Sequence, residues 1–215
     1  MNHRTKIALG LGAAALLVAG CATLPAPAEL DAQALAMIKS AFRDEGIAKV
    51  ARLDQDLGQA ACSSDHEPPK DVAARVEAEA LASIKWPSGG QYLGDWREGE
   101  KLAQNGRGMT WTDASAATRA NGAQCYNCHQ IGKAEISFGT IGPSLYNYGK
   151  LRGVKDPADP ASAAIVQYTW GKLWNSKAYA ACSNMPRFGH MALLDEGQIR
   201  HLMALLLDPK SPVNE

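Results

Sequence analysis

The residues of this chain that are best suited to chemistry lie together in residues 124–130, which read QCYNCHQ. Two residues separate Cys125 from Cys128, and His129 follows directly. Three kinds of site use such a spacing: a zinc knuckle, a thiol–disulfide redox pair, and a covalently attached haem c. The residues elsewhere in the chain have to decide among them.

A structural zinc site of this type needs two further ligands, usually a second Cys or His pair. The chain offers only isolated histidines: His66, His190 and His201. A thioredoxin-like redox pair requires a strand before the motif, and no apolar strand precedes Gln124. In C-x-x-C-H, two thioethers fix the porphyrin and the adjacent imidazole reaches the iron, which explains the short spacing. The sequence therefore predicts one covalent haem c, attached through Cys125 and Cys128 with His129 as an axial ligand.

Met185, in the segment NMPRFG, is the predicted second axial ligand, because the proline after it favours an extended turn that holds the sulfur in place. A thioether opposite a histidine raises the reduction potential and favours an electron acceptor. Six-coordinate iron also leaves no open position for a substrate. Five other residues compete for this role: Met109, Met191, Met203, His190 and His201.

Two residues are expected to lie near the haem without binding its iron. Residues 142–145, GPSL, resemble the Gly-Pro-x-Leu stretch of small c-type cytochromes, in which the proline carbonyl accepts a hydrogen bond from the proximal histidine. Pro143 is therefore the expected partner of His129. Arg187 is a candidate partner for a haem propionate, with an ordinary surface position as the alternative.

The N-terminus has the pattern of an export signal. Residues 1–20 combine a basic start with an apolar run too short to span a bilayer. Small residues precede Cys21, as in a bacterial lipobox, so Cys21 is the predicted lipidation site and a possible membrane tether. Cleavage after Ala28 is the alternative. Residues 21–29 are then a linker, and the expected location is the periplasm.

The remaining cysteines, apart from the C-x-x-C pair, are Cys62 and Cys182. Free thiols tend to oxidise outside the cytoplasm, so these two are predicted to form a disulfide. Acidic and basic residues balance at 22 each, and this zero net charge gives no indication of nucleic-acid binding.

Hydrophobic periodicity predicts an all-α protein. A helical extension spans residues 30–86, with helices expected to start at Asp31 and Asp71, and its charged residues are interpreted as solvated helix faces. A second domain spans residues 87–215, with one helix starting near Asp95 and another after a capping box at Asp195. The long region between those two helices is rich in loops, which is unusual unless a cofactor fills its centre.

Several segments together resemble the SoxX subunit of the SoxAX cytochrome of bacterial thiosulfate oxidation. They are GMTW, GAQCYNCHQI, GTIGPSLYNYGK, YTWGKLWNSKAYAACSNMPRFGH and LLLDPKSPVN. The resemblance runs from residue 94 to residue 214 and is weaker in residues 30–87. It implies a class I cytochrome c fold with His129 and Met185 as iron ligands.

The resemblance also implies a function. It predicts a heterodimer with a SoxA-type cytochrome, acting as an L-cysteine S-thiosulfotransferase that joins thiosulfate oxidatively to a carrier-protein cysteine. This chain would be the electron-transfer subunit, without catalytic residues of its own, and would pass electrons to a small cytochrome c. The alternative is a free-standing periplasmic electron shuttle for an unrelated redox enzyme, although zero net charge does not favour a strongly charged docking face.

Overall fold

The computed structural model describes residues 25–108, 110, 112–113 and 121–215, and these parts are helical or irregular. They contain no β-strand, apart from an isolated antiparallel bridge between Glu45 and Ala48. The all-α prediction is therefore confirmed for the described residues. The predicted signal (residues 1–20), Cys21 and Met109 lie outside them.

Two compact units divide the chain, residues 1–43 and residues 44–215. The first unit contributes helix α2, Pro27–Ala41, which begins four residues before the predicted start at Asp31. Proline suits the first helical position because its missing N–H has no intrahelical partner there. The larger side chains around α2 are all exposed: Leu30, Leu35, Met37, Ile38 and Phe42.

The second unit contains most of the predicted extension, because residues 44–86 belong to the same compact unit as residues 87–215. The sequence placed a boundary at residue 86, whereas the structure divides the chain after Arg43. The reason is packing: Val76, Ala80 and Ile84 are buried, and the latter two join the main hydrophobic core. We call residues 44–86 the extension segment.

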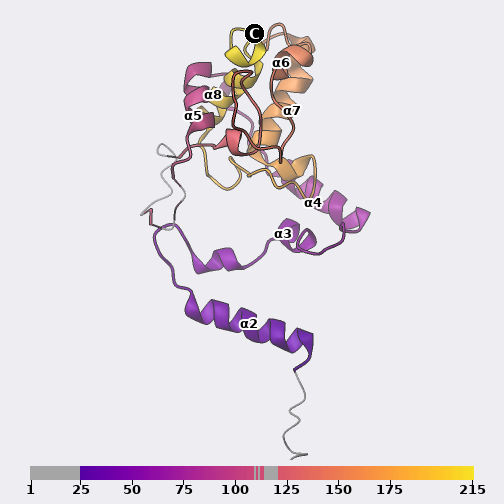
Figure 1. The fold of residues 1–215 in the computed structure, drawn as a ribbon. Coiled ribbons are helices and arrows are strands. Elements are labelled where there is room, and N and C mark those ends of the chain that lie inside the picture. Colours follow the sequence, from indigo (N-terminus) through magenta and orange to yellow (C-terminus); the bar gives the residue numbers. More distant parts are fainter. Residues whose placement is uncertain (1–24, 109, 111, 114–120) are drawn as a thin grey trace, which may run out of the picture. The chain divides into compact units, whose positions relative to one another are not determined.

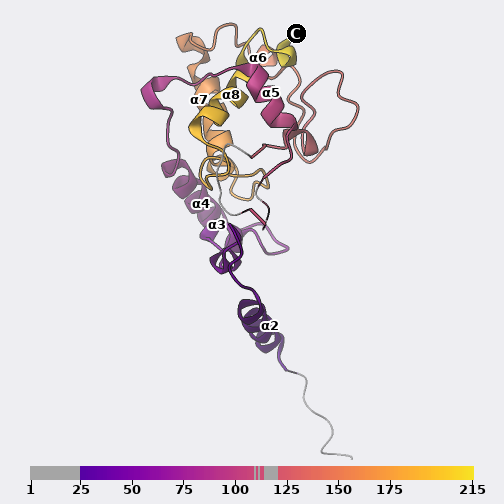
Figure 2. The ribbon, with the colours of Figure 1, turned by 90° about the vertical axis from the view of Figure 1, so that its left-hand side faces the viewer.

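The helical elements of the second unit are short, and Figures 1 and 2 show their arrangement. Their bounds are η1 Val50–Leu53, α3 Leu57–Ala61, α4 Lys70–Ala82, η2 Ser88–Gly90, α5 Trp96–Gln104, η4 Cys125–Asn127, α6 Tyr148–Leu151, η5 Pro160–Ser162, α7 Ala163–Trp174, η6 Ser176–Ala178, α8 Glu196–Leu207 and η7 Pro212–Asn214.

The crossing of α5 and α8 forms the centre of this unit. Asp95 caps α5 by accepting a hydrogen bond from the Arg97 amide, and the capping box at Asp195 opens α8, as predicted. Gly99 makes the close approach possible, since a Cβ there would lie 2.2 Å from the carbonyl oxygen of His201. Residues 202–207 of α8 are all buried.

Helix α7 lies in the region that was predicted to be rich in loops, and it packs against α8 (Figure 1). Trp170 is fully buried in the core and its ring stacks on that of Trp174, with centroids 5.9 Å apart. The indole N–H of Trp170 donates to the Lys85 carbonyl at 2.9 Å, which ties the extension segment to α7. At the C-terminus, η7 lies beside α6.

None of the helices in the described residues combines the length and the apolar character needed to cross a bilayer.

Candidate functional site

The C-x-x-C-H motif lies in a loop, residues 121–145, that we call the histidine loop. Its start is fixed to the end of α5, because the Ala123 amide donates to the Leu102 carbonyl at 2.9 Å and the Gln124 amide to the Asn105 carbonyl at 3.2 Å. Gln124 takes a left-handed conformation, with φ of 49°. The chain therefore turns sharply just before Cys125.

A single tight turn then presents the three motif side chains. Residues Cys125–Asn127 form η4, and the His129 amide donates to the Cys125 carbonyl at 2.9 Å. The later part of the loop folds back on this turn, since the Gly142 amide donates to the Cys128 carbonyl at 2.9 Å. The histidine loop is thus closed by its own backbone hydrogen bonds.

His129 is oriented by this returning chain. Its Nδ1 lies 2.6 Å from the Pro143 carbonyl oxygen, which can only accept, so Nδ1 carries the proton and donates. This hydrogen bond agrees with the one expected for Pro143. A Cβ on Gly142 would lie 2.1 Å from His129 Cε1, so the backbone lies directly against the ring. The other ring nitrogen, Nε2, is then the one available to bind a metal.

The two motif cysteines are free thiols, whereas Cys62 and Cys182 form a disulfide, in agreement with the predicted pairing. Burial raises the pKa of the Cys125 thiol to about 12. Catalytic thiols of disulfide oxidoreductases have a lowered pKa, because the thiolate is the reactive form. The direction of the shift at Cys125 is the opposite of this pattern.

Large apolar side chains of the histidine loop face solvent. Ile136 is 96% exposed and Ile141 is 78% exposed, and Phe138 is partly exposed between them. Ile141 directly precedes Gly142, the residue in contact with the His129 ring. Exposed apolar side chains in the loop that also carries an oriented imidazole and two cysteines fit an apolar, covalently attached macrocycle. The donor set and its surroundings are therefore compatible with haem c.

Met185 is half-buried and packs against the hydrophobic core. It belongs to residues 175–190, which we call the methionine loop. Its carbonyl accepts a hydrogen bond from the Ser176 hydroxyl at 2.6 Å, and its amide donates to the Ser183 hydroxyl at 3.3 Å. The backbone of Met185 is therefore fixed on both sides by serines of the same loop.

The structure places the competing ligands in other environments. His201 is engaged at the start of α5, where its Nδ1 accepts a hydrogen bond from the Asp95 amide at 2.9 Å. Met203 is fully buried in the core within α8. Met191 and His190 are exposed, and Met109 lies outside the described residues.

Arg187, the candidate propionate partner, instead pairs with a carboxylate of the extension segment. Its Nη1 lies 2.6 Å from Asp56 Oδ2, and its side chain is only 14% exposed. The guanidinium is therefore already engaged by protein, and this contact was not foreseen, because the charged residues of the extension were interpreted as solvated.

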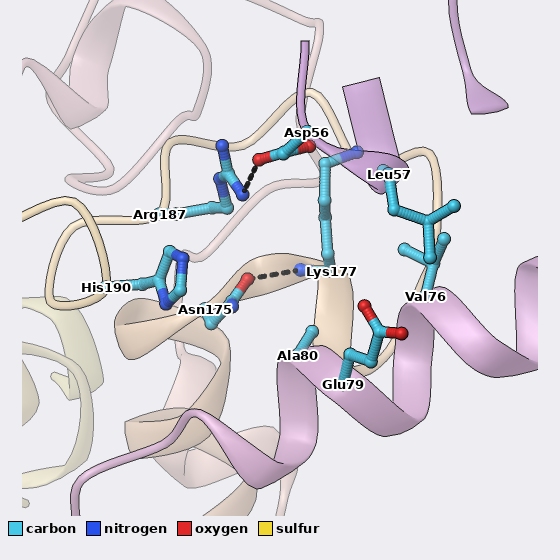
Figure 3. Close-up of a pocket in the computed structure, with 10 residues that line it drawn as sticks. Asp56, Leu57, Val76, Glu79, Ala80, Asn175, Lys177, Arg187 and His190 are labelled. Atoms are coloured by element: carbon cyan, nitrogen blue, oxygen red, sulfur yellow. Dashed lines mark hydrogen bonds and ion pairs between the residues drawn. The ribbon is translucent and has the colours of Figure 1, made fainter. Parts of the chain in front are cut away.

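A cavity of about 140 Å³ lies where the extension segment meets the methionine loop (Figure 3). Arg187 and His190 project into it from the methionine loop, while Val76, Glu79 and Ala80 project from α4 on the opposite side. Partial burial of the ring, and then the charge of Arg187, lower the pKa of His190. The ring is therefore held toward its neutral form next to a guanidinium.

Sequence reasoning missed three residues that hold the methionine loop. Glu77 accepts a hydrogen bond from the Ala181 amide at 3.1 Å, and Lys177 donates to the Ala181 carbonyl at 2.7 Å. Asp56 pairs with Arg187, as described above. The only sequence signal for any of them is the Asp56–Gln59 spacing of a capping box, which the structure contains at the start of α3.

No group of three or more His, Cys, Asp and Glu side chains suited to holding a metal ion occurs among the described residues. An iron held by one imidazole and one thioether within a porphyrin would not form such a group.

A scan with models of known protein families finds no match to the chain. Comparison with curated proteins finds an "Uncharacterized lipoprotein" of Aquifex aeolicus (strain VF5), which is 36% identical over 165 residues. The alignment covers 75% of this chain and 73% of the Aquifex protein.

Proposed function

We propose that this chain, which belongs to the same family as the Aquifex aeolicus lipoprotein, is a monohaem c-type cytochrome with a class I cytochrome c fold. We further propose that it is the electron-accepting SoxX-type subunit of a thiosulfate-oxidising complex. Its haem would be attached through Cys125 and Cys128 and ligated by His129 and Met185.

One observation carries this proposal: the His129 ring donates through Nδ1 to the Pro143 carbonyl at 2.6 Å. His129 directly follows two cysteines at C-x-x-C spacing, and neither of them takes part in a disulfide. This hydrogen bond sets the tautomer in which Nε2 holds a lone pair for iron. The crossing of α5 and α8 at Gly99 supports the proposed class I cytochrome c fold, because it brings together the first and last α-helices of residues 87–215.

Bound at this site, a haem c supplies one reversible electron at a potential that a methionine ligand raises. The chain's own residues would hold and orient it. Cys125 and Cys128 would fix its position, the Pro143 carbonyl would keep His129 oriented, and the exposed Ile136 and Ile141 of the same loop would offer apolar surface to it.

In the proposed complex, a carrier-protein cysteine loses its thiol proton to solvent and forms a sulfur–sulfur bond with the terminal sulfur of thiosulfate. Two electrons leave the sulfur atoms in this step. The SoxA-type partner hosts the bond formation, and this chain accepts the electrons one at a time and passes them to a downstream cytochrome. No substrate-binding residue is assigned to this chain.

The name of the Aquifex relative supports the lipobox interpretation of Cys21. We therefore propose that the mature chain starts at a lipidated Cys21 and is tethered to a membrane on its periplasmic side. Mass spectrometry of the native protein tests both modifications, because it measures acylation at Cys21 and the mass added at Cys125 and Cys128.

The function is tested by mixing the purified protein with thiosulfate and the carrier protein, in the presence and absence of the SoxA-type subunit. We expect thiosulfate-dependent haem reduction only when all components are present. Reduction that does not need the SoxA-type subunit would contradict the proposal. A colourless protein would exclude it completely, and a monomer that never forms the heterodimer would indicate the simple electron shuttle.

A further inference from the structure

The methionine loop is fixed to the core at its two ends, and Ala178, Tyr179 and Met185 pack against the core between these ends. At the start, the loop continues directly from α7 at Trp174. At the end, Phe188 is buried and the His190 amide donates to the Trp174 carbonyl at 3.0 Å. The serine hydrogen bonds to Met185 lie within the loop and move with it. Besides this packing, a disulfide and a hydrogen bond from the extension segment hold the backbone of the loop near Met185.

The extension segment supplies this support just before Met185. Cys182, three residues earlier, forms the disulfide with Cys62 at the end of α3. Ala181 is also held, since its amide donates to Glu77 of α4 at 3.1 Å. A covalent bond and a charge-assisted hydrogen bond thus reach the loop from two different helices of the extension segment.

The extension segment also holds the loop just after Met185. Arg187, two residues later, pairs with Asp56 at 2.6 Å, and the arginine side chain is largely buried. Asp56 is itself fixed in position, because its other carboxylate oxygen caps α3 by accepting from the Gln59 amide at 2.7 Å. Along the chain, Met185 therefore lies between two attachment points that both involve the extension segment, and Figure 3 shows the second of them, the Asp56–Arg187 pair.

We propose that the extension segment is a brace that positions Met185 on the haem iron, with Asp56, Glu77 and Cys62 as positioning residues. This inference rests on the proposed function. A loop that is already ordered loses less conformational entropy when its methionine binds. Without the brace, Met185 would leave the iron more often.

Electrostatics adds to the role of Asp56. Lys177 and Arg187 both line the cavity beside it, and Asp56 interacts favourably with both charges. Burial, and then the charge of Arg187, lower the pKa of Lys177, which indicates that the two cations repel each other. Without the Asp56 carboxylate, less negative charge would offset the repulsion between Lys177 and Arg187 in the methionine loop.

Carbon monoxide binding to the reduced holoprotein measures the brace directly. The gas has to displace Met185, so its apparent affinity rises with the fraction of molecules in which Met185 is detached. We expect Asp56→Ala to raise this affinity by up to about fivefold, the ratio that corresponds to the upper limit of about 1 kcal/mol for an ion pair screened by solvent. Replacement of Cys62 and Cys182 together by serine should raise it by about tenfold or more.

Asp44→Asn is the matched control, because Asp44 forms an ion pair of 3.4 Å with Lys49 in the same extension segment. This variant should bind carbon monoxide as the wild type does. Asp56→Glu, which keeps the carboxylate, should restore most of the wild-type affinity. If a cysteine variant fails to fold, thiol reduction of the disulfide in the folded wild type replaces it, with the same expected rise.

Wild-type affinities in both the Asp56→Ala and the disulfide-free proteins would overturn the brace and leave the proposed function intact. Failure of the proposed function gives different results. A wild type without covalent haem would refute the cytochrome assignment, and a Met185→Ala protein with unchanged carbon monoxide affinity would refute methionine ligation.

Discussion

The histidine loop and the methionine loop hold their proposed iron ligands by different means. The histidine loop is closed by short-range contacts: the Pro143 carbonyl orients His129 from only 14 residues away. The methionine loop depends on distant contacts, because the disulfide to Cys62 spans 120 residues and Asp56 lies 131 residues from Arg187. One ligand is thus positioned locally, and the other by a separate part of the chain.

This difference fits the chemistry proposed for each side. Two covalent thioethers would keep His129 beside the iron under all conditions, so its loop needs only to set the orientation of the ring. Met185 has no covalent attachment of its own. Its position therefore depends on how well the loop is ordered, and the extension segment provides that order.

The largest effect is expected from the covalent side. Replacing Cys125 and Cys128 together by serine should remove covalent haem almost completely, because no thioether can then form. Haem content per protein after acid and organic extraction measures this effect. The variant that lacks Cys62 and Cys182 is the matched control, and it should retain its haem. Loss of haem in the control as well would show that the disulfide, too, is needed for haem attachment.

Met185→Ala should have the next largest effect, on ligation rather than attachment. Mutation of a residue that only supports a metal ligand typically changes the affinity for the metal by about 10–100-fold. Loss of the ligand itself should have at least as large an effect, so we expect the carbon monoxide affinity to rise by roughly a hundredfold or more. The reduction potential should fall. Met191→Ala, at an exposed methionine six residues later, should leave both quantities unchanged. The reverse pattern would assign the ligand to Met191.

Gly142→Ala tests the local positioning of His129 and should have a smaller effect. The added Cβ would lie 2.1 Å from His129 Cε1, so the ring or the loop has to shift. Overpacking of this kind costs about 1–3 kcal/mol in the free energy of unfolding, which denaturant titration of the holoprotein measures. Gly132→Ala is the control, since its nearest neighbour is the Tyr126 hydroxyl at 3.6 Å. Equal stabilities would show that the close packing is not important.

Sequence patterns were most informative where structure is determined locally. Capping residues gave the starts of α5 and α8 at Asp95 and Asp195, and the Gly-Pro spacing gave the hydrogen bond between Pro143 and His129. These features depend on residues within one turn or one short loop. The cysteine count gave the long-range disulfide, because only two thiols remained.

Other features could not be obtained from local patterns. Helix α7 was missed because its buried face is built from aromatic and small residues, although Val166, Trp170 and Leu173 follow helical spacing. The partners of Asp56 and Glu77 were missed for a different reason. A carboxylate that binds a loop more than 100 residues away looks the same in sequence as a solvated one.

The smallest expected effect is the pH dependence of the ion pair that supports the methionine loop. Burial acts to raise the pKa of Asp56, but the Gln59 amide and the Arg187 guanidinium outweigh it and hold the pKa below its ordinary value. A lowered folded-state pKa stabilises the protein above the unfolded-state pKa, and this contribution is lost as the pH falls through the folded-state value. The loss should therefore occur below about pH 4.

The size of this contribution is below about 1 kcal/mol, because the Asp56 side chain is 42% exposed and solvent screens the pair. The measurement compares the unfolding free energies of the wild type and Asp56→Asn at neutral pH and at about pH 3. The wild type should be more stable at neutral pH, and the difference should shrink in acid because the carboxylate becomes protonated, first in the unfolded state and then, at lower pH, in the folded state. A difference that stays constant with pH would show that Asp56 supports the methionine loop through its hydrogen bonds and packing alone, and not through its charge.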